Sequence, residues 1–333
     1  MTLRDVLVIG AGPAGLATAI AAARNGLDYQ VIEKGALVNS LLHFPIEMVF
    51  FTTPELMEIG GMPFVSPYDK PTRLEALRYY RRVSDAFKLD IVFDETVTAI
   101  SRDHDSSDRP GSFVVDMQSG RGVRRSLHAR TVVLATGAYD FANTIGVSGE
   151  DLPHVSHYYT QPHPFFRKRV IVVGGRNSAA EAALGIYRAG GHVTLVHRRA
   201  ALGEGIKYWV KPDIENRIKE GSISARFDTH VVEIRPTEVL VEGATGIREA
   251  LPADAVFLLT GYGSDTTLLR NAGVAIDPET CGPAFDADTF ETNVPGLYVA
   301  GAVVAGKESG KIFIENGRFH GERVINGIVK ALG

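Results

Sequence analysis

The sequence predicts an α/β protein with two Rossmann-like dinucleotide-binding domains. Segments typical of buried strands and of helices alternate along the 333 residues, which is the pattern of proteins built on parallel sheets. Two glycine-rich turns, at residues 10–15 and 174–179, each follow an apolar strand and precede a helix. Because the turns lie far apart in the chain, they indicate two similar domains and not a short-period repeat.

The first turn lies inside a complete βαβ unit. Residues 5–9 are predicted as a buried strand, residues 16–25 as an alanine-rich helix and residues 29–32 as a second strand. The turn therefore stands at the carboxyl end of a strand, where open α/β sheets bind their ligands.

Three glycines in this turn supply the backbone that a pyrophosphate requires. Gly10 allows the tight turn, Gly12 allows close approach of the ligand, and Gly15 allows the helix to pack on the strand. The first N–H groups of the helix then face the anion. Glu33 follows the second strand, at the position where a carboxylate accepts hydrogen bonds from a ribose. These residues predict a dinucleotide site.

A second βαβ unit begins at the predicted strand 169–173. The turn contains Gly174 and Gly175, but Arg176 stands where the pattern has its next glycine. A helix is predicted for residues 180–189 and a strand for residues 192–196. Further strands are predicted at the sequence positions 131–137, 255–261 and 296–301.

Basic residues follow the second strand of this unit. His197, Arg198 and Arg199 occupy the position that faces the adenosine ribose, where paired arginines favour a 2′-phosphate over a free hydroxyl. The alternative is an exposed basic loop. Since Glu33 would repel a phosphate and the arginines would attract one, the two sites predict two nucleotides, a resident flavin and NADPH.

The composition excludes several classes of protein. The net charge is −4 without a long run of Lys or Arg, which argues against nucleic acid and anionic membranes as partners. The uncharged run 6–23 has the apolarity of a membrane span, but the glycine turn interrupts it. The single cysteine, Cys281, allows no internal disulfide, so we expect a reducing cytoplasm. The polar stretch 102–111 is predicted as a hairpin tip.

The whole chain resembles the low-molecular-weight, thioredoxin reductase-like FAD/NAD(P)H flavoproteins. Within them it is similar to the bacillithiol disulfide reductases of the YpdA type. The motifs that carry this resemblance are Gly10-x-Gly12-x-x-Gly15, Glu33-Lys34-Gly35 through Asn39-Ser40, Phe50-Phe51-Thr52-Thr53 through Glu58-Ile59-Gly60, Ala135-Thr136-Gly137, Gly174-Gly175, His197-Arg198-Arg199, Thr260-Gly261-Tyr262, Ala300-Gly301 and Phe313 through Gly321.

The resemblance implies an FAD domain at residues 1–140 and 263–333, with an NADPH domain inserted at residues 141–262, each of the three-layer β/β/α type. It further implies a cytoplasmic homo-oligomer, a dimer or a tetramer. The expected FAD-binding residues are Gly10, Gly12, Pro13, Ala14, Gly15, Glu33, Lys34, Asn39, Ser40, Thr136, Gly137, Gly301, Ala302, Lys311 and Ile312. The expected NADPH-binding residues are Gly174, Gly175, Arg176, Asn177, Ser178, His197, Arg198, Arg199, Gly261 and Tyr262.

The chain departs from these families in its cysteines. Thioredoxin reductases carry a Cys-x-x-Cys pair, which is absent from this sequence, and YpdA-type enzymes carry a cysteine in the first turn, where this chain has Ala14. We therefore expect no catalytic cysteine, and we expect Cys281 to be a buried or incidental thiol. Ala302 stands where thioredoxin reductases have an aspartate, as in the YpdA branch.

Two histidine features stand outside the nucleotide motifs. His154, His157 and His163 lie close together in sequence, but neither a cysteine nor a carboxylate completes a metal site, so no metal is expected. His320 lies near the flavin in the resemblance and is the candidate proton donor. The alternative for His320 is a packed histidine on the terminal helix.

The sequence thus predicts an FAD-containing, NADPH-dependent oxidoreductase that passes electrons to a small-molecule disulfide such as bacillithiol disulfide. The first alternative is a reductase of ferredoxin, flavodoxin or a quinone, because a flavin can release electrons singly without a thiol. The second alternative is a flavoprotein that senses NADPH without catalysis. Reduction of added disulfides or of one-electron carriers distinguishes these hypotheses.

Overall fold

The computed structural model describes residues 3–103 and 111–333. The chain divides into two compact units. The first contains Met1–His43, Met48–Phe141 and Tyr262–Gly333, and the second contains Phe44–Glu47 and Ala142–Gly261. Most of the predicted hairpin tip, residues 104–110, lies outside the described residues. No helix in the described part of the chain is both long and apolar enough to cross a bilayer.

The first unit is built on a seven-stranded sheet. The strand order is β3 (Ile91–Val92), β2 (Tyr29–Ile32), β1 (Leu3–Ile9), β6 (Arg124–Leu134), β5 (Phe113–Ser119) and β4 (Glu95–Arg102), with β15 (Leu297–Val299) also paired to β6. The strands β1, β2, β3 and β15 join β6 in a parallel core. The first half of β6 instead pairs antiparallel with β5, which pairs antiparallel with β4.

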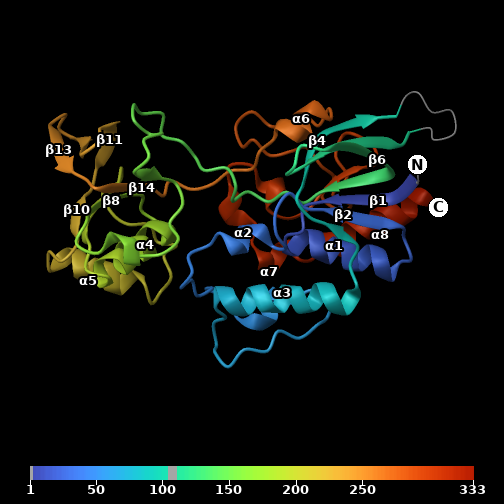
Figure 1. Ribbon diagram of the computed structural model, residues 1–333, viewed down its shortest axis with the longest axis horizontal. Coiled ribbons are helices and arrows are strands. Elements are labelled where there is room, and N and C mark those ends of the chain that lie inside the picture. The colour runs from blue at the N-terminus through green and yellow to red at the C-terminus, as the bar shows by residue number, and fades with distance from the viewer. Residues whose placement is uncertain (1–2, 104–110) are drawn as a thin grey trace. The chain divides into compact units, whose positions relative to one another are not determined.

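Helices cover one face of this sheet, and the antiparallel ribbon covers the other (Figure 1). The helices on that face are α1 (Pro13–Arg24), α2 (Asn39–Leu42), α3 (Arg73–Phe87), α7 (Ile314–Gly317) and α8 (His320–Leu332). The short helix α6 (Thr267–Asn271) instead lies beside β4, on the ribbon side. Ribbon residues such as Phe113 and Met117 pack on Leu7 and Ile9 of β1. The first unit therefore has the predicted three layers, β/β/α.

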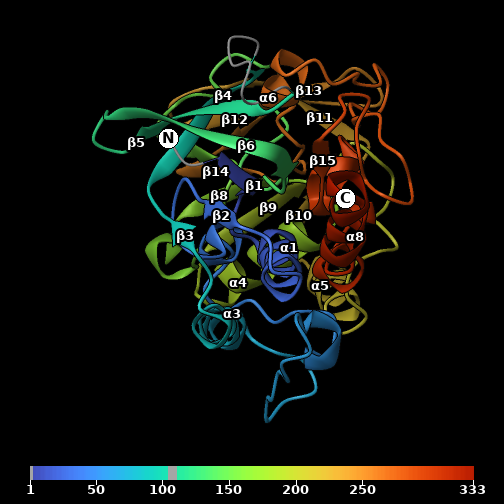
Figure 2. The ribbon, with the colours of Figure 1, turned by 90° about the vertical axis from the view of Figure 1, so that its right-hand side faces the viewer.

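The helices α1 and α8 lie side by side under the sheet (Figure 2). A Cβ added to Gly321 of α8 would lie 2.5 Å from the backbone N of Thr18 in α1. Any side chain at position 321 would therefore push the two helices apart. The small residues of α1 and this glycine allow the C-terminal helix to lie against the N-terminal βαβ unit.

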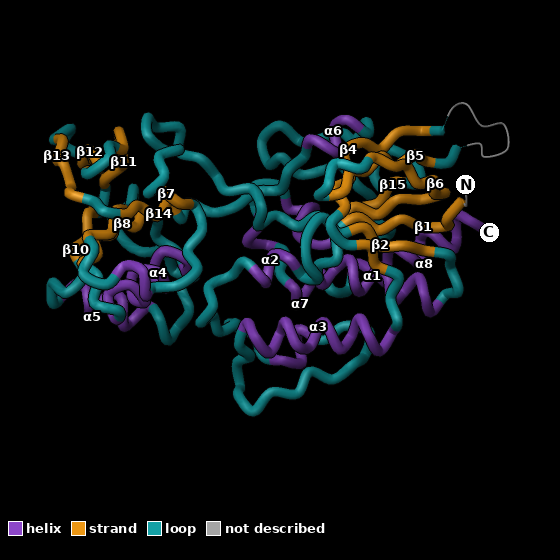
Figure 3. Tube along the Cα trace, viewed as in Figure 1, coloured by secondary structure: helices purple, strands orange, loops and turns teal. Residues whose placement is uncertain are grey.

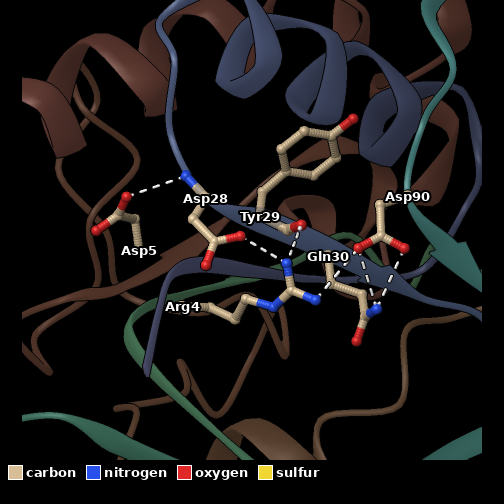
Figure 4. Close-up of polar contacts among 6 residues, drawn as sticks. All are labelled: Arg4, Asp5, Asp28, Tyr29, Gln30 and Asp90. Carbon is tan, nitrogen blue, oxygen red and sulfur yellow. Dashed lines mark hydrogen bonds and ion pairs between the residues drawn. The ribbon is translucent and has the colours of Figure 1, made fainter. Parts of the chain in front are cut away.

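Polar contacts join the amino ends of β1, β2 and β3 (Figure 4). Arg4 Nη1 donates to Asp28 Oδ1 at 2.5 Å, and Arg4 Nη2 lies 3.3 Å from Asp90 Oδ2. Gln30 Nε2 also donates to the Asp90 carboxylate. These contacts contribute little energy individually because they are partly exposed, but they fix the register of three strands whose carboxyl ends form the opposite edge.

The second unit has its own parallel sheet, in the order β10 (Ser224–Arg226), β9 (His192–Val196), β8 (Arg169–Val173), β14 (Ala255–Leu258) and β7 (Val155–Ser156). Figure 3 shows helices on one face and a three-stranded antiparallel ribbon on the other. The helices are α4 (Asn177–Arg188) and α5 (Lys211–Lys219), and the ribbon is β11 (Thr229–Ile234), β12 (Glu238–Gly243) and β13 (Arg248–Pro252). Both units thus repeat one three-layer design.

The described residues also form four short 3₁₀ helices: Pro54–Met57, His163–Phe165, Gly301–Ala305 and Ser309–Lys311. The third begins directly after β15, at the same edge of the first sheet where β1 leads into α1. Because the carboxyl ends of the parallel strands meet there, residues from the N-terminal and C-terminal parts of the chain come together at that edge.

Candidate functional site

The first glycine turn connects β1 to α1, and two of its glycines are required by packing. Gly10 has a φ of +106°, and a Cβ added to it would lie 2.5 Å from the carbonyl oxygen of Ala135. A Cβ on Gly15 would lie 1.9 Å from the carbonyl oxygen of Gly10. Gly12 differs, because a Cβ there would meet nothing within 4 Å. The turn therefore presents an open cradle at Gly12.

This cradle fits a phosphate. Gly12 is the N-cap of α1 and Pro13 begins the helix; no side chain of the described residues caps this end, and its first turn holds no acidic residue. The positive end of the helix dipole and the first N–H groups are consequently available to an anion. These observations satisfy the requirements of the diphosphate of FAD.

Glu33 supports the turn from the end of β2. Its side chain is buried, Oε2 accepts a hydrogen bond from the N–H of Ala11 at 2.7 Å, and Oε1 accepts one from the N–H of Gly35 at 2.9 Å. Burial raises the pKa of Glu33, while these two N–H groups and Lys34 oppose the shift. Each carboxylate oxygen can accept a further hydrogen bond. Glu33 can therefore hold the turn in place and still make the expected contact with a ribose.

The remaining expected FAD residues gather at the same edge of the first unit. Lys34 Nζ pairs with Asp140 Oδ2 at 2.7 Å, and a Cβ on Gly137 would lie 4.0 Å from Ser40 Oγ. A Cβ on Gly301 would lie 2.7 Å from the Cβ of Ala14. The position of Ala14 therefore faces the turn after β15.

Three further residues expected at the FAD site contact neighbouring residues of the first unit. Asn39 begins α2, and its Oδ1 accepts from the N–H of Ala36 at 3.3 Å. Lys311 is exposed and pairs with Glu308 at 2.6 Å. Ile312 lies against Gly317, which in turn lies beside Gly301.

His320 begins α8 and is buried against the turn after β15. The N–H of Gly301 donates to its Nδ1 at 3.1 Å, and its ring stacks on Phe290 with centroids 4.2 Å apart. Burial, with a smaller contribution from Arg323, lowers the pKa of His320 to about 4. The ring is neutral at pH 7 with its proton on Nε2, and this geometry favours the packed-histidine alternative over a protonated acid.

We expect this histidine to make the stability of the protein sensitive to acid. Below pH 6.5 the unfolded chain binds a proton that the folded chain does not, so the free energy of unfolding falls toward pH 4. Between pH 7.5 and 5 the loss is about 2 kcal/mol. His320→Asn keeps an acceptor for Gly301 and does not titrate. In urea unfolding at both pH values the variant should lose about 2 kcal/mol less than the wild type, and equal losses would contradict the assignment.

The second glycine turn connects β8 to α4. Gly174 has a φ of +152°, and a Cβ on it would lie 2.6 Å from the carbonyl oxygen of Leu259 and 2.9 Å from the Cβ of Ala179. A Cβ on Gly175 would lie 2.2 Å from the ring of His197. Arg176 occupies the N-cap position of α4, makes no side-chain hydrogen bond to the helix backbone there, and is exposed, so its side chain finds room. The turn is therefore tight although it lacks a third glycine.

The basic residues after β9 face solvent beside this turn. Arg198 and Arg199 are exposed, and neither has an ion-pair partner within residues 3–103 and 111–333. Their backbone is fixed, since Asp228 N donates to Arg199 O. Burial, followed by the charges of Arg199 and Arg198, lowers the pKa of His197. Two unpaired guanidinium groups on a fixed backbone fit a phosphate.

The other expected NADPH residues separate between the units. Ser178 is exposed in the first turn of α4, which has no acidic residue. Gly261 belongs to the second unit, where its carbonyl accepts from the N–H of Asn143 at 2.9 Å. Tyr262 belongs to the first unit, where its ring lies 4.5 Å from that of Tyr139.

Some residues at these two sites belong to no recognisable sequence motif. They are Asp140, which pairs with Lys34, and residues 203–206, of which Gly203 contacts the second turn. Lys207, by contrast, belongs to the stretch Lys207-Tyr208-Trp209, which resembles a loop of the family that lines the nicotinamide domain. An aspartate shortly after a strand and a glycine-containing loop are too common to identify a site. Within the described residues, no cluster of three or more His, Cys, Asp or Glu side chains is arranged to hold a metal.

Comparisons with known proteins cover the full chain. The family model described as pyridine nucleotide-disulphide oxidoreductase matches residues 7–301. Bacilliredoxin reductase Bdr of Bacillus subtilis (strain 168) is 37% identical over 330 residues, 99% of each chain. The solved structure of bacillithiol disulfide reductase Bdr (YpdA) from Bacillus cereus is 36% identical with a TM-score of 0.95 and covers 99% of this chain and 100% of that one. The Staphylococcus aureus structure of the same name is 32% identical, with a TM-score of 0.93 and 100% of both chains covered.

Proposed function

We infer the function from family membership: the chain belongs to the pyridine nucleotide-disulphide oxidoreductases. It has their fold of two Rossmann-like units and is an FAD-containing, NADPH-dependent oxidoreductase. The resemblance to YpdA-type reductases is confirmed over the whole chain. The comparisons do not favour the ferredoxin, flavodoxin or quinone reductase alternative, or the non-catalytic sensor.

We propose that the electron acceptor is a small-molecule disulfide, with bacillithiol disulfide as the first candidate. The observation that carries this proposal is the similarity over full length to structures named as bacillithiol disulfide reductases, at 36% identity and a TM-score of 0.95. The net reaction converts NADPH, a proton and the disulfide into NADP⁺ and two thiols. We further propose a cytoplasmic location, since the lone cysteine suits a reducing compartment. The resemblance to YpdA-type reductases adds the proposal of a homo-oligomer, a dimer or a tetramer.

We propose that residues 1–140 and 263–333 hold FAD and that residues 141–262 hold NADPH. FAD, when bound, supplies a centre that exchanges electrons with both NADPH and the acceptor. The open cradle at Gly12 and the uncapped end of α1 suit its diphosphate, and Glu33 suits a ribose. The exposed pair Arg198 and Arg199 suits the 2′-phosphate that distinguishes NADPH from NADH.

The single cysteine bears directly on how the acceptor is reduced. Cys281 is half-buried in a loop, with a φ of +55° and its N–H bonded to the carbonyl of Asp277. With one cysteine, the chain cannot form an internal dithiol. We propose that the acceptor disulfide is reduced without forming a mixed disulfide with this protein. Both sulfur atoms of the bond that breaks then belong to the substrate and leave as thiols.

We expect Cys281→Ser to retain NADPH-dependent disulfide reduction within about twofold, because a serine replaces a group that takes no part in the reaction. Pretreatment of the wild-type holoprotein with a thiol-alkylating reagent should likewise leave the rate unchanged. The measurement is the initial rate of NADPH oxidation with disulfide present. Loss of activity in both arms would assign a catalytic role to Cys281.

The proposed function is tested by an acceptor screen on the FAD-loaded protein. Bacillithiol disulfide should accelerate NADPH oxidation in proportion to its concentration and should yield free thiol. Ferredoxin, flavodoxin and a quinone serve as comparison acceptors. If a one-electron carrier is reduced and no disulfide is, the proposed acceptor is wrong.

A further inference from the structure

A short segment crosses the second glycine turn. In this segment, residues 203–207, the N–H of Gly203 donates to the carbonyl oxygen of Gly175 at 2.8 Å. A Cβ on Gly203 would lie 3.1 Å from that oxygen and 3.4 Å from Cγ of Arg176. We call residues 203–207 the strap. It lies in direct backbone contact with the turn expected to meet NADPH.

Asn177, the first residue of α4, holds the strap with both ends of its amide. Nδ2 donates to the carbonyl of Gly205 at 2.9 Å, and Oδ1 accepts from the N–H of Lys207 at 2.8 Å. The sequence-based expectation placed Asn177 against the nucleotide. Because each end of the amide already has a backbone partner, Asn177 acts through the strap.

Glu181 provides the second attachment, one helical turn further along α4. It forms an ion pair with Nζ of Lys207, whose side chain is only 5% exposed. Desolvated pairs of this kind are costly to break, because one charge is then left buried without its partner. Leu202, directly before the strap, and Ile206, within it, are both buried, so apolar packing also holds the segment in place.

The strap fixes the orientation of one peptide group in the turn. In a planar trans peptide, the N–H points opposite to the C=O. Since the carbonyl of Gly175 is bonded to Gly203, the N–H of Arg176 points away from the strap. That N–H stands at the N-terminal end of α4, where a diphosphate would be bound. Without the strap this peptide could rotate.

We propose that Asn177 and Glu181 are positioning residues for the dinucleotide of the second unit. They hold the strap, and the strap orients the 175–176 peptide toward the diphosphate. This inference rests on the proposed binding of NADPH by this unit. It assigns the two side chains an effect on nucleotide affinity without contact with the nucleotide.

The test compares Asn177→Ala and Glu181→Ala with the wild-type holoprotein. Each variant should raise the KM for NADPH and the Kd for NADP⁺, the latter measured by calorimetry, about tenfold. The kcat at saturating NADPH and the FAD content should not change. Glu181→Gln keeps an oxygen acceptor for Lys207 and should recover part of the affinity. Asp213→Asn, which removes the ion pair of Arg188 between α4 and α5, is the matched control and should bind as the wild type does.

A second readout separates positioning of the diphosphate from a disturbance of the site expected to bind the 2′-phosphate. The diphosphate is common to NADPH and NADH, so the strap variants should lower kcat/KM equally for both and leave their ratio unchanged. A changed ratio, or unchanged affinity in both alanine variants, would overturn the inference. If the wild-type protein itself binds no NADP⁺, the proposed function fails instead.

Discussion

Gly12→Ala is expected to produce a folded but colourless protein. The backbone at Gly12 is extended, with φ −72° and ψ 175°, and a Cβ there has open space, so alanine adds no strain. The methyl group would occupy the cradle at the start of α1. Loss of two charge-assisted hydrogen bonds to the diphosphate, at about 1.5–3 kcal/mol each, would weaken FAD binding by more than about a hundredfold.

The FAD content of the purified protein, read from its absorbance after removal of free flavin, checks this result. Gly120→Ala is the matched control, because Gly120 belongs to the same unit and also has open space around its added Cβ. It should retain FAD. Gly15→Ala should fail more broadly, since its Cβ would lie 1.9 Å from a carbonyl oxygen. A yellow Gly12→Ala protein would show that the cradle does not hold the diphosphate.

Arg198→Ala combined with Arg199→Ala is expected to abolish the preference for NADPH over NADH. Each guanidinium that bonds the 2′-phosphate contributes about 1.5–3 kcal/mol. Removing both should lower kcat/KM for NADPH about a thousandfold and leave the value for NADH within about twofold. Since both arginines are exposed, the effect should shrink as ionic strength rises.

The measurement is kcat/KM for both nucleotides at low and moderate salt. Arg248→Ala is the control, because it removes an exposed arginine of the same unit that pairs with Glu242. It should leave the NADPH preference intact. Equal losses with NADPH and NADH in the double variant would mean that these arginines serve the fold and do not read the phosphate.

The sequence predicted the parts of the fold that depend on short, apolar segments. The strands at 29–32, 169–173 and 192–196 have the predicted bounds in the structure. The first helix begins three residues earlier than the predicted 16–25, at Pro13, because proline is tolerated at the first helical position. The helix α4 likewise begins at Asn177, ahead of the predicted Ala180.

Two elements had no counterpart in the sequence-based prediction. The helix α3 is largely polar, but its start carries a capping box in which Thr72 and Glu75 bond each other's backbone N–H groups. That signal was present in the sequence. The ribbon β11–β13 buries alternate residues such as Val239 and Val241, a weak pattern in short strands.

The sequence predicts those site residues that belong to one local motif. It does not predict contacts between residues that lie far apart in the chain. The glycine turns, Glu33 and the arginine pair follow from strand-turn-helix spacing. The strap depends on bonds from Asn177 to residues 205 and 207, which lie a full strand and loop later in the chain. The low pKa of His320 depends on burial beside Phe290. No periodicity in the sequence encodes either contact.

The central claim is that electrons from NADPH reach a small-molecule disulfide with no thiol of this protein involved. The most direct test uses Cys281→Ser holoprotein, reduced anaerobically with one equivalent of NADPH and then mixed with bacillithiol disulfide. We predict that the yellow absorbance of oxidised FAD returns in full and that two thiols appear per disulfide consumed. If the flavin stays reduced in the variant while the wild type reoxidises, the claim is contradicted and Cys281 is required.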